Sequence, residues 1–149
     1  MRSASSLLTV MMATVSVGCG GDGTGPSVLS LGGTWTYSES FSSQAPNQGI
    51  SCNNTGTINI VQSGSTFTGN FNQTGLCTGP GGSEDNSGSG SVTGGQVNGS
   101  QVSFQVPFCQ YQGTASGGSP PNRLNGTSSC TVQISGVNVN FSGTWQASR

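Results

Sequence analysis

Apolar residues alternate with small polar residues through most of the chain, and this period of two constrains the fold more than any other feature. In a β-strand, successive side chains point to opposite faces of the sheet, so the pattern yields one apolar face and one polar face. The first run places on one face Leu31, Gly33, Trp35, Tyr37, Glu39 and Phe41. Later runs repeat the pattern, and the sequence therefore predicts an all-β domain over residues 31–149.

Short glycine-containing segments separate these runs and are typical of β-hairpin turns. Gly64-Ser65 and Ser135-Gly136 are two of them. Asn98-Gly99 is the dipeptide that most readily supplies the two positive φ angles of a type I′ turn. Pro107 interrupts the long run 101–115, and we expect a bend or bulge there because proline cannot donate to a β-ladder.

The number of strands bears on whether the sheet closes. Seven alternating runs can be counted, and splitting a long one gives about eight strands. An even number lets an antiparallel up-and-down β-barrel close, and a two-sheet β-sandwich is the alternative. Gly33-Thr34-Trp35 returns as Gly143-Thr144-Trp145. In a closed barrel the first and last strands are antiparallel, so both tryptophans would lie at the end that the N-terminal segment enters.

Gly33-Thr34-Trp35 resembles the Gly-x-Trp on the first strand of the lipocalin and avidin group of small up-and-down barrels. In those families a basic residue near the last strand commonly lies over this tryptophan, and the resemblance gives that place to Arg149, with a modest cation–π gain. We expect Trp35, Trp145 and Arg149 to plug one end of the barrel. The biotin-binding residues of avidins do not carry over, since Tyr37 and Phe41 occupy the expected polar positions.

The apolar faces also suggest where a ligand would bind. Candidate residues to line a cavity are the aromatic side chains Tyr37, Phe41, Phe67 and Phe104. A cavity at these residues would favour ligand binding, whereas a filled interior would favour a structural role.

Four of the five cysteines suit an oxidising compartment and two disulfide bonds. Sequence alone allows three connectivities for Cys52, Cys77, Cys109 and Cys130. A hairpin turning at Gly64-Ser65 would bring Cys52 opposite Cys77, and one turning at Ser119-Pro120 would bring Cys109 opposite Cys130. We therefore predict these two pairs, each stabilising the fold by about 3 kcal/mol in the loop-closure model. A zinc site is disfavoured because no two cysteines are closely spaced.

The N-terminus reads as a targeting segment. The apolar run from Leu7 to Val17 is too short for a transmembrane helix, and Val15-Ser16-Val17-Gly18-Cys19 resembles the bacterial lipoprotein signal. That resemblance implies a signal peptide at residues 1–18 and a lipid on Cys19, with outer-membrane sorting because Gly20 and Gly21 replace the Asp of inner-membrane retention. Plain secretion is the alternative. The glycine-rich residues 19–30 are expected to form a flexible tether.

Charge and composition limit the chemistry. The chain of 149 residues has no lysine and no histidine, and its net charge is -1. It therefore lacks the basic surface that a nucleic-acid partner requires. It also lacks the commonest catalytic base and metal ligand, so we expect no metal, no cofactor and no enzymatic activity. Glu84-Asp85-Asn86 lacks the residue order of a calcium loop and is expected to be a solvated loop.

Two function classes follow. In the first, a lipid-anchored, monomeric envelope protein binds a small apolar molecule, a glycan or a protein through loops or a shallow cup. In the second, the domain is structural and has no ligand site. A membrane-spanning barrel is a third and weaker option, because the runs are mostly six to eight residues long and such strands need about nine to eleven.

Overall fold

The structure, a computed structural model, describes residues 28–44 and 49–149. The predicted signal peptide, the lipidation site Cys19 and tether residues up to 27 lie outside the described residues. Within the described ranges, no helix has the length and apolarity needed to cross a membrane.

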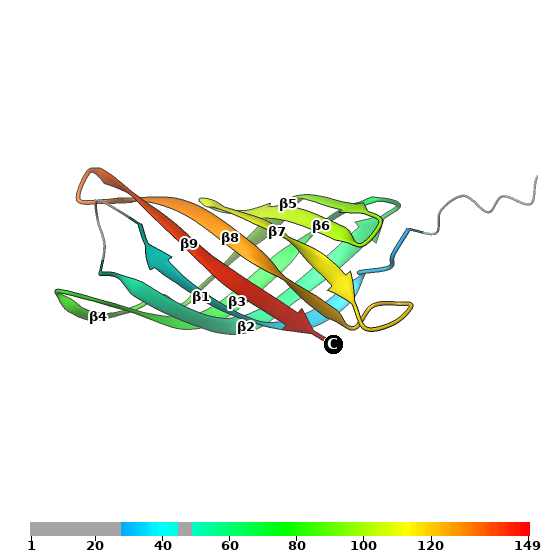
Figure 1. Ribbon diagram of the computed structural model, residues 1–149, viewed down its shortest axis with the longest axis horizontal. Coiled ribbons are helices and arrows are strands. Elements are labelled where there is room, and N and C mark those ends of the chain that lie inside the picture. Colours follow the sequence, from blue (N-terminus) through cyan, green and yellow to red (C-terminus); the bar gives the residue numbers. More distant parts are fainter. Residues whose placement is uncertain (1–27, 45–48) are drawn as a thin grey trace, which may run out of the picture.

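The described residues form a single antiparallel sheet that closes into an elongated barrel (Figure 1). Its strands are β1 (Gly33–Ser43), β2 (Ser51–Ser63), β3 (Thr66–Gly79), β4 (Gly82–Asp85), β5 (Gly88–Asn98), β6 (Gln101–Val106), β7 (Cys109–Ser116), β8 (Arg123–Ile134) and β9 (Val137–Ser148). The order is β2-β1-β9-β8-β7-β6-β5-β3-β4, and pairing of β2 with β3 closes the sheet. The predicted all-β, up-and-down barrel of eight strands is confirmed, and the sandwich alternative is wrong.

The additional strand, β4, corrects the prediction of a loop around Glu84. β4 pairs with the last residues of β3, while β5 pairs with the earlier ones. Leu76 lies opposite Asp85 and Gln73 lies opposite Gly88, so both strands share one register against β3. They are two pieces of one long strand interrupted at residues 86–87. The apolar alternation missed β4 because all four of its residues are exposed.

Two turns show how the local sequence sets the hairpins. Ser135-Gly136 forms the expected turn, and its φ angles of 51° and 80° fit type I′. The turn expected at Asn98-Gly99 is displaced by one residue, because Val97 pairs with Val102. Its loop residues are Gly99 and Ser100, and only Gly99 has a positive φ, so the type I′ prediction is wrong there.

Pro107 lies in a tight turn between two strands, whereas we expected a bend or bulge within a single strand. Val106 pairs directly with Cys109, so Pro107 and Phe108 form a two-residue connection between β6 and β7. Phe108 has a φ of 68°, a left-handed conformation that is uncommon for a bulky side chain. This turn is the split that raises the number of barrel strands to eight.

Both predicted disulfides are confirmed. Cys52 and Cys77 lie opposite each other on β2 and β3, with an S–S distance of 1.96 Å. Cys109 and Cys130 lie opposite each other on β7 and β8, with an S–S distance of 2.04 Å. The hairpin turns therefore determine the connectivity that cysteine spacing alone leaves open.

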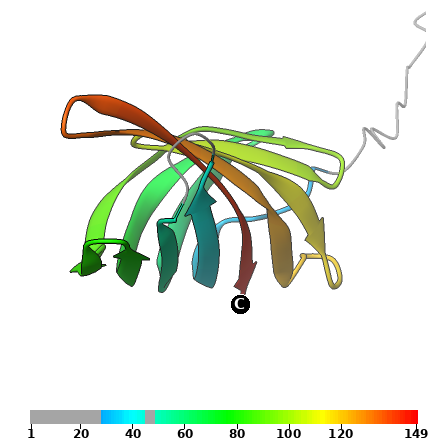
Figure 2. The ribbon, with the colours of Figure 1, turned by 60° about the vertical axis from the view of Figure 1, so that its left-hand side comes forward.

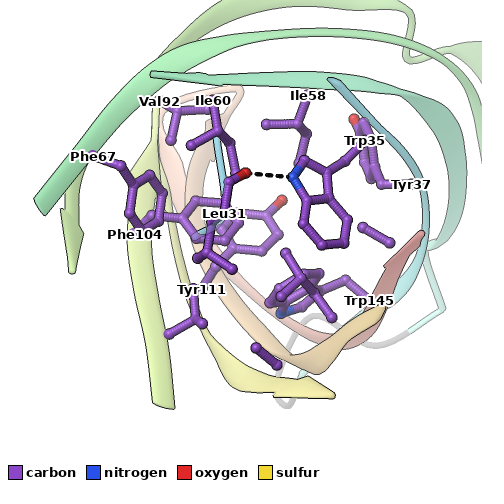
Figure 3. Close-up of a cluster of buried hydrophobic side chains, with 14 of the residues drawn as sticks. Leu31, Trp35, Tyr37, Ile58, Ile60, Phe67, Val92, Phe104, Tyr111 and Trp145 are labelled. Atoms are coloured by element: carbon purple, nitrogen blue, oxygen red, sulfur yellow. Dashed lines mark hydrogen bonds between the residues drawn. The ribbon is translucent and has the colours of Figure 1, made fainter. Parts of the chain in front are cut away.

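One end of the barrel is filled by side chains, and we call it the closed end (Figure 3). Trp35 and Leu31 are fully buried there, and Trp35 Nε1 donates a hydrogen bond to the Leu31 carbonyl oxygen at 2.7 Å. The guanidinium carbon of Arg149 lies 4.4 Å from the centroid of the Trp35 ring. Arg149 also donates hydrogen bonds to three carbonyl oxygens, those of Ser30, Gly32 and Pro121.

The two tryptophans lie at the same end, as an even strand number requires. Glu39 on β1 pairs with Trp145 on β9. Trp35 lies four residues before Glu39 on β1, nearer the end of the barrel where the C-terminus lies (Figure 1). Leu29 and Ser30, which composition assigns to the tether, contact the barrel through Gln62 and Arg149. The barrel therefore begins at its closed end.

The outer wall of the barrel is polar. Exposed threonines pair across strands, as in Thr36 with Thr57 and Thr127 with Thr144. A transmembrane barrel shows the opposite sidedness, with apolar residues pointing outward. β3 is 14 residues long, so the expectation of short strands was wrong. This barrel differs from a transmembrane barrel in the direction of its apolar side chains, which point inward.

Candidate ligand-binding site

A cavity of about 510 Å³ lies at the end of the barrel opposite the closed end, and we call it the cup. Figure 2 turns this end of the molecule toward the viewer. The apolar walls of the cup include Phe41, Ile50, Phe71, Val106, Val132 and Phe141, together with both disulfides. Small-molecule sites in proteins range over about 300–1,000 Å³, so the cup has a suitable size.

The cup exists because the inward-facing residues become smaller along the barrel. At the closed end the inward positions hold large side chains, among them Trp35, Phe67, Phe104, Leu124 and Trp145. In the cup the corresponding positions of four strands hold small residues, namely Cys52, Cys77, Gly79, Cys109 and Cys130. The disulfides join neighbouring strands within a second, smaller core cluster, to which Val139 and Phe141 also belong.

Only one of the four predicted ligand-lining residues lies at the cup. Phe41 lines it and makes an edge-to-face contact with Phe141 at a centroid distance of 5.6 Å. Tyr37, Phe67 and Phe104 instead belong to the core of the closed end (Figure 3). The prediction was wrong for these three because alternation specifies the face of a strand and not the depth along the barrel.

Phe104 illustrates how tightly the closed end is packed. Its ring stacks on Tyr111 at 4.7 Å with an interplanar angle of 6°. It also meets the edge of Trp145 at 5.4 Å. Such aromatic contacts stabilise the core of the closed end.

Glu39 forms the polar floor of the cup. Its side chain is only 5% exposed, yet it lines the cavity. The Tyr111 hydroxyl donates to Oε2 at 2.9 Å, and the Ser128 hydroxyl donates to Oε1 at 2.6 Å. The Asn54 side chain supplies a third hydrogen bond. A carboxylate at the centre of a barrel with three fixed neighbours is a built polar site.

Burial controls the ionisation of this group. Burial raises the pKa of Glu39, and the hydrogen bonds from Ser128, Tyr111 and Asn54 oppose that rise without cancelling it. The pKa of the Tyr111 hydroxyl is also raised, first by burial and then by the adjacent Glu39. The same two causes raise the pKa of Tyr37. Both tyrosines therefore stay protonated beside Glu39.

A chain of side-chain hydrogen bonds links this floor to the break between β4 and β5. Tyr37 donates to Gln73 at 2.6 Å, and Gln73 donates to the Asn86 carbonyl oxygen at 3.0 Å. The Asn86 amide then donates to Asn54 Oδ1 at 3.0 Å. A Cβ on Gly75 would overlap that oxygen, so glycine is required where Asn54 packs. Every buried side-chain polar atom in the described ranges has a partner.

Charge is separated along the barrel axis. Among the described residues the acidic side chains are Glu39, Glu84 and Asp85, and all three line the cup. The cations of the described residues are Arg123 and Arg149, and both lie at the closed end. The cup is therefore an acidic cavity with apolar walls.

The mouth of the cup is apolar and accessible. Phe108 lines the cavity from the β6–β7 turn and is 76% exposed. Ile134 lines it from the end of β8 and is 41% exposed. Large apolar side chains held in solvent at the mouth of a cavity are typical of a binding site.

Glu39 was not predicted as a site residue, although the sequence carries a signal for it. Glu39 stands on the apolar face of its strand, between Tyr37 and Phe41, where a charged side chain is expensive unless it is paired. No group of three His, Cys, Asp or Glu side chains positioned to hold a metal ion occurs among the described residues.

Comparison with known proteins yields no relative for this chain. A scan against protein-family models and searches of curated proteins and of solved structures each gave no match. The function is therefore inferred from the cup and from the residues that build it.

Proposed function

We propose that this chain is a lipid-anchored envelope protein whose barrel binds a small ligand with an apolar body in the cup. The observation that carries the proposal is a cavity of about 510 Å³, with apolar walls and a polar floor, in a barrel whose other end is filled. Apolar walls with a few converging polar groups are the usual design of small-molecule sites. The role proposed is binding rather than catalysis.

The topology supports an orientation for this protein. Leu29 and Ser30, which precede β1, contact Gln62 and Arg149 at the closed end, and the cup lies at the other end. A lipid on Cys19, with residues 19–30 as the tether, would hold the closed end toward the membrane, so the cup would face away from it. We propose attachment to the outer membrane, with secretion without a lipid as the alternative.

Native mass spectrometry of the protein, extracted gently from its host, tests the ligand. We expect a co-purified small molecule with the wild-type protein. Val132→Trp, which fills the cup, should abolish that adduct. Val61→Trp adds the same bulk on the outer wall, where Val61 is 66% exposed, and should keep it. An adduct that both variants retain would contradict binding in the cup, and an empty wild type that also takes up no apolar probe would favour the purely structural alternative.

Metabolic labelling with palmitate tests the anchor independently of the cup. Wild-type protein should incorporate the label and fractionate with membranes, whereas Cys19→Ser should not incorporate it. An unlabelled wild type would rule out the lipoprotein assignment and leave secretion.

A further inference from the structure

We propose that the ligand of the cup is an alkyl- or arylalkylamine in its protonated form, whose ammonium group binds Glu39 while its apolar body fills the cup. This inference rests on the proposed function and adds the chemical class of the ligand. Three observations support it, and each concerns a different part of the cavity.

The first observation is the charge of the cavity. All three acidic side chains of the described residues line the cup, and its lining includes no arginine. A carboxylate or phosphate ligand would meet only like charge there, and the repulsion is strongest at Glu39, which is buried. A cation is attracted mainly by Glu39 at the floor and only weakly by the exposed rim residues Glu84 and Asp85, whose charges solvent screens.

The second observation is the geometry of the floor. An ionised carboxylate has about four acceptor directions, and Tyr111, Ser128 and Asn54 use three of those of Glu39. An ammonium group brings three donors, and the remaining carboxylate direction of Glu39 and the hydroxyl oxygen of Tyr111 can accept two of them, since both residues line the cup. The three neighbours also fix the carboxylate, so little order is lost when a cation binds.

The third observation is what lies between the floor and the mouth. Phe41 and Phe141 form an aromatic wall, and the two disulfides and Val132 complete an apolar surface that offers few hydrogen-bond partners. The exposed Phe108 and Ile134 extend this surface to the mouth. A ligand that fits the whole cavity therefore has a cationic end and an apolar body.

Three probes that share an eight-carbon chain separate the effect of the ligand's charge on affinity from the effect of its apolar chain. They are n-octylammonium, n-octanol and n-octanoate. Binding to the whole protein is measured by calorimetry at neutral pH, below the concentrations at which the probes aggregate. We expect octylammonium to bind about tenfold or more tighter than octanol, since hydrogen bonds to charged groups outweigh neutral ones by that much. Octanoate should bind most weakly.

Glu39→Gln and Glu84→Gln provide the matched pair of variants. Glu39→Gln keeps the shape of the floor and removes its charge, so octylammonium and octanol should then bind about equally. Glu84→Gln removes an exposed rim charge, which solvent screens, and should keep most of the preference. Circular dichroism of each variant checks that the barrel is folded.

The pH dependence of the wild type gives a second readout that requires no variant. Burial raises the pKa of Glu39, and a bound ammonium favours the ionised form, so octylammonium affinity should rise with pH while octanol affinity does not. The other titratable groups around the cavity are Tyr37, Tyr111, Glu84 and Asp85. Asp85→Asn should leave the profile unchanged, because the Asp85 carboxyl is already held ionised by Ser87.

The outcomes distinguish the inference from the function on which it rests. Octanol binding as tight as octylammonium binding, unaffected by Glu39→Gln, would overturn the amine assignment and leave apolar ligand binding intact. Tighter binding of octanoate would also overturn it. Failure of all three probes to bind would count against the cup as a ligand site, and so against both proposals.

Discussion

Glu39 combines a cost to the fold with the role in ligand binding that we propose for it. A carboxylate on the apolar face of β1 loses its hydration, and only the hydrogen bonds from Tyr111, Ser128 and Asn54 compensate for this loss. Apolar residues of similar volume would fill the same space at lower cost. Since the network is complete and faces a cavity, binding is the role that explains it best.

Glu39→Gln should change how stability depends on pH. Burial raises the pKa of Glu39 in the folded state, so the folded protein holds this proton more tightly than the unfolded chain does. Stability should therefore fall as pH rises from the ordinary range of the carboxyl through its raised pKa. The variant lacks this fall, so its stability relative to that of the wild type should increase as the pH rises above the ordinary range of a carboxyl group. Thermal melts over a series of pH values measure the difference, and a difference that does not change with pH would contradict the prediction.

Phe108→Gly should separate stability from binding. A φ of 68° costs a bulky residue about 1 kcal/mol, which glycine does not incur, so the variant should be as stable as the wild type or slightly more stable. It should nevertheless bind apolar probes more weakly, because an apolar wall of the mouth is lost.

Ser135→Gly is the control for this substitution. Ser135 has a φ of 51° in another turn and does not line the cup, so this change should leave affinity unaltered. Equal affinity of Phe108→Gly and wild-type protein would show that Phe108 is not part of the site.

At the scale of elements, most of the fold could be predicted and the site could not. The disulfide partners of Cys52 and Cys109 could be predicted from the sequence. Alternate side chains of a strand share a face, and the position of the turn determines which residues of two adjacent strands are paired. β4 was missed because a strand beyond the core has no apolar face to reveal it. Phe67 and Phe104 were assigned to the correct face but the wrong depth, since strand periodicity carries no information about position along the barrel axis.

The disulfides should matter most where core packing is weakest. Each closes a loop of just over twenty residues, since their sequence separations are 25 and 21. Replacing Cys109 and Cys130 together by serine should lower the free energy of unfolding by about 3 kcal/mol, and the Cys52 and Cys77 pair should behave alike. Urea titrations measure both losses. Midpoints unchanged from the wild type would show that the cup walls do not depend on these bonds.

At the scale of the whole molecule, Arg149 contacts residues from the opposite end of the described chain. Its guanidinium contacts the Trp35 ring and the carbonyl oxygens of Ser30 and Gly32, which precede β1. Arg149 follows β9, so one side chain connects the residue after the last strand with the residues before the first strand.

Arg149→Gln should loosen the closed end without altering the cup directly. The variant loses the cation–π contact and two or more hydrogen bonds, so we expect a loss of about 1–3 kcal/mol in stability. Hydrogen exchange should accelerate at Leu31 and Trp35 before it does at Cys52 or Cys130. Arg123→Gln, a change of an exposed arginine at the same end, is the control. An equal acceleration of hydrogen exchange in all strands would contradict the prediction that Arg149 stabilises the closed end in particular.

β1 begins and β9 ends at the closed end, so the cup is bordered by turns, among them Pro80-Gly81 and Pro107-Phe108. A turn that joins two adjacent strands can be lengthened or changed in sequence without altering the path of the chain or the register of the strands behind it. If the cup binds a ligand as we propose, a few substitutions in these turns would change its specificity while the rest of the barrel keeps its sequence.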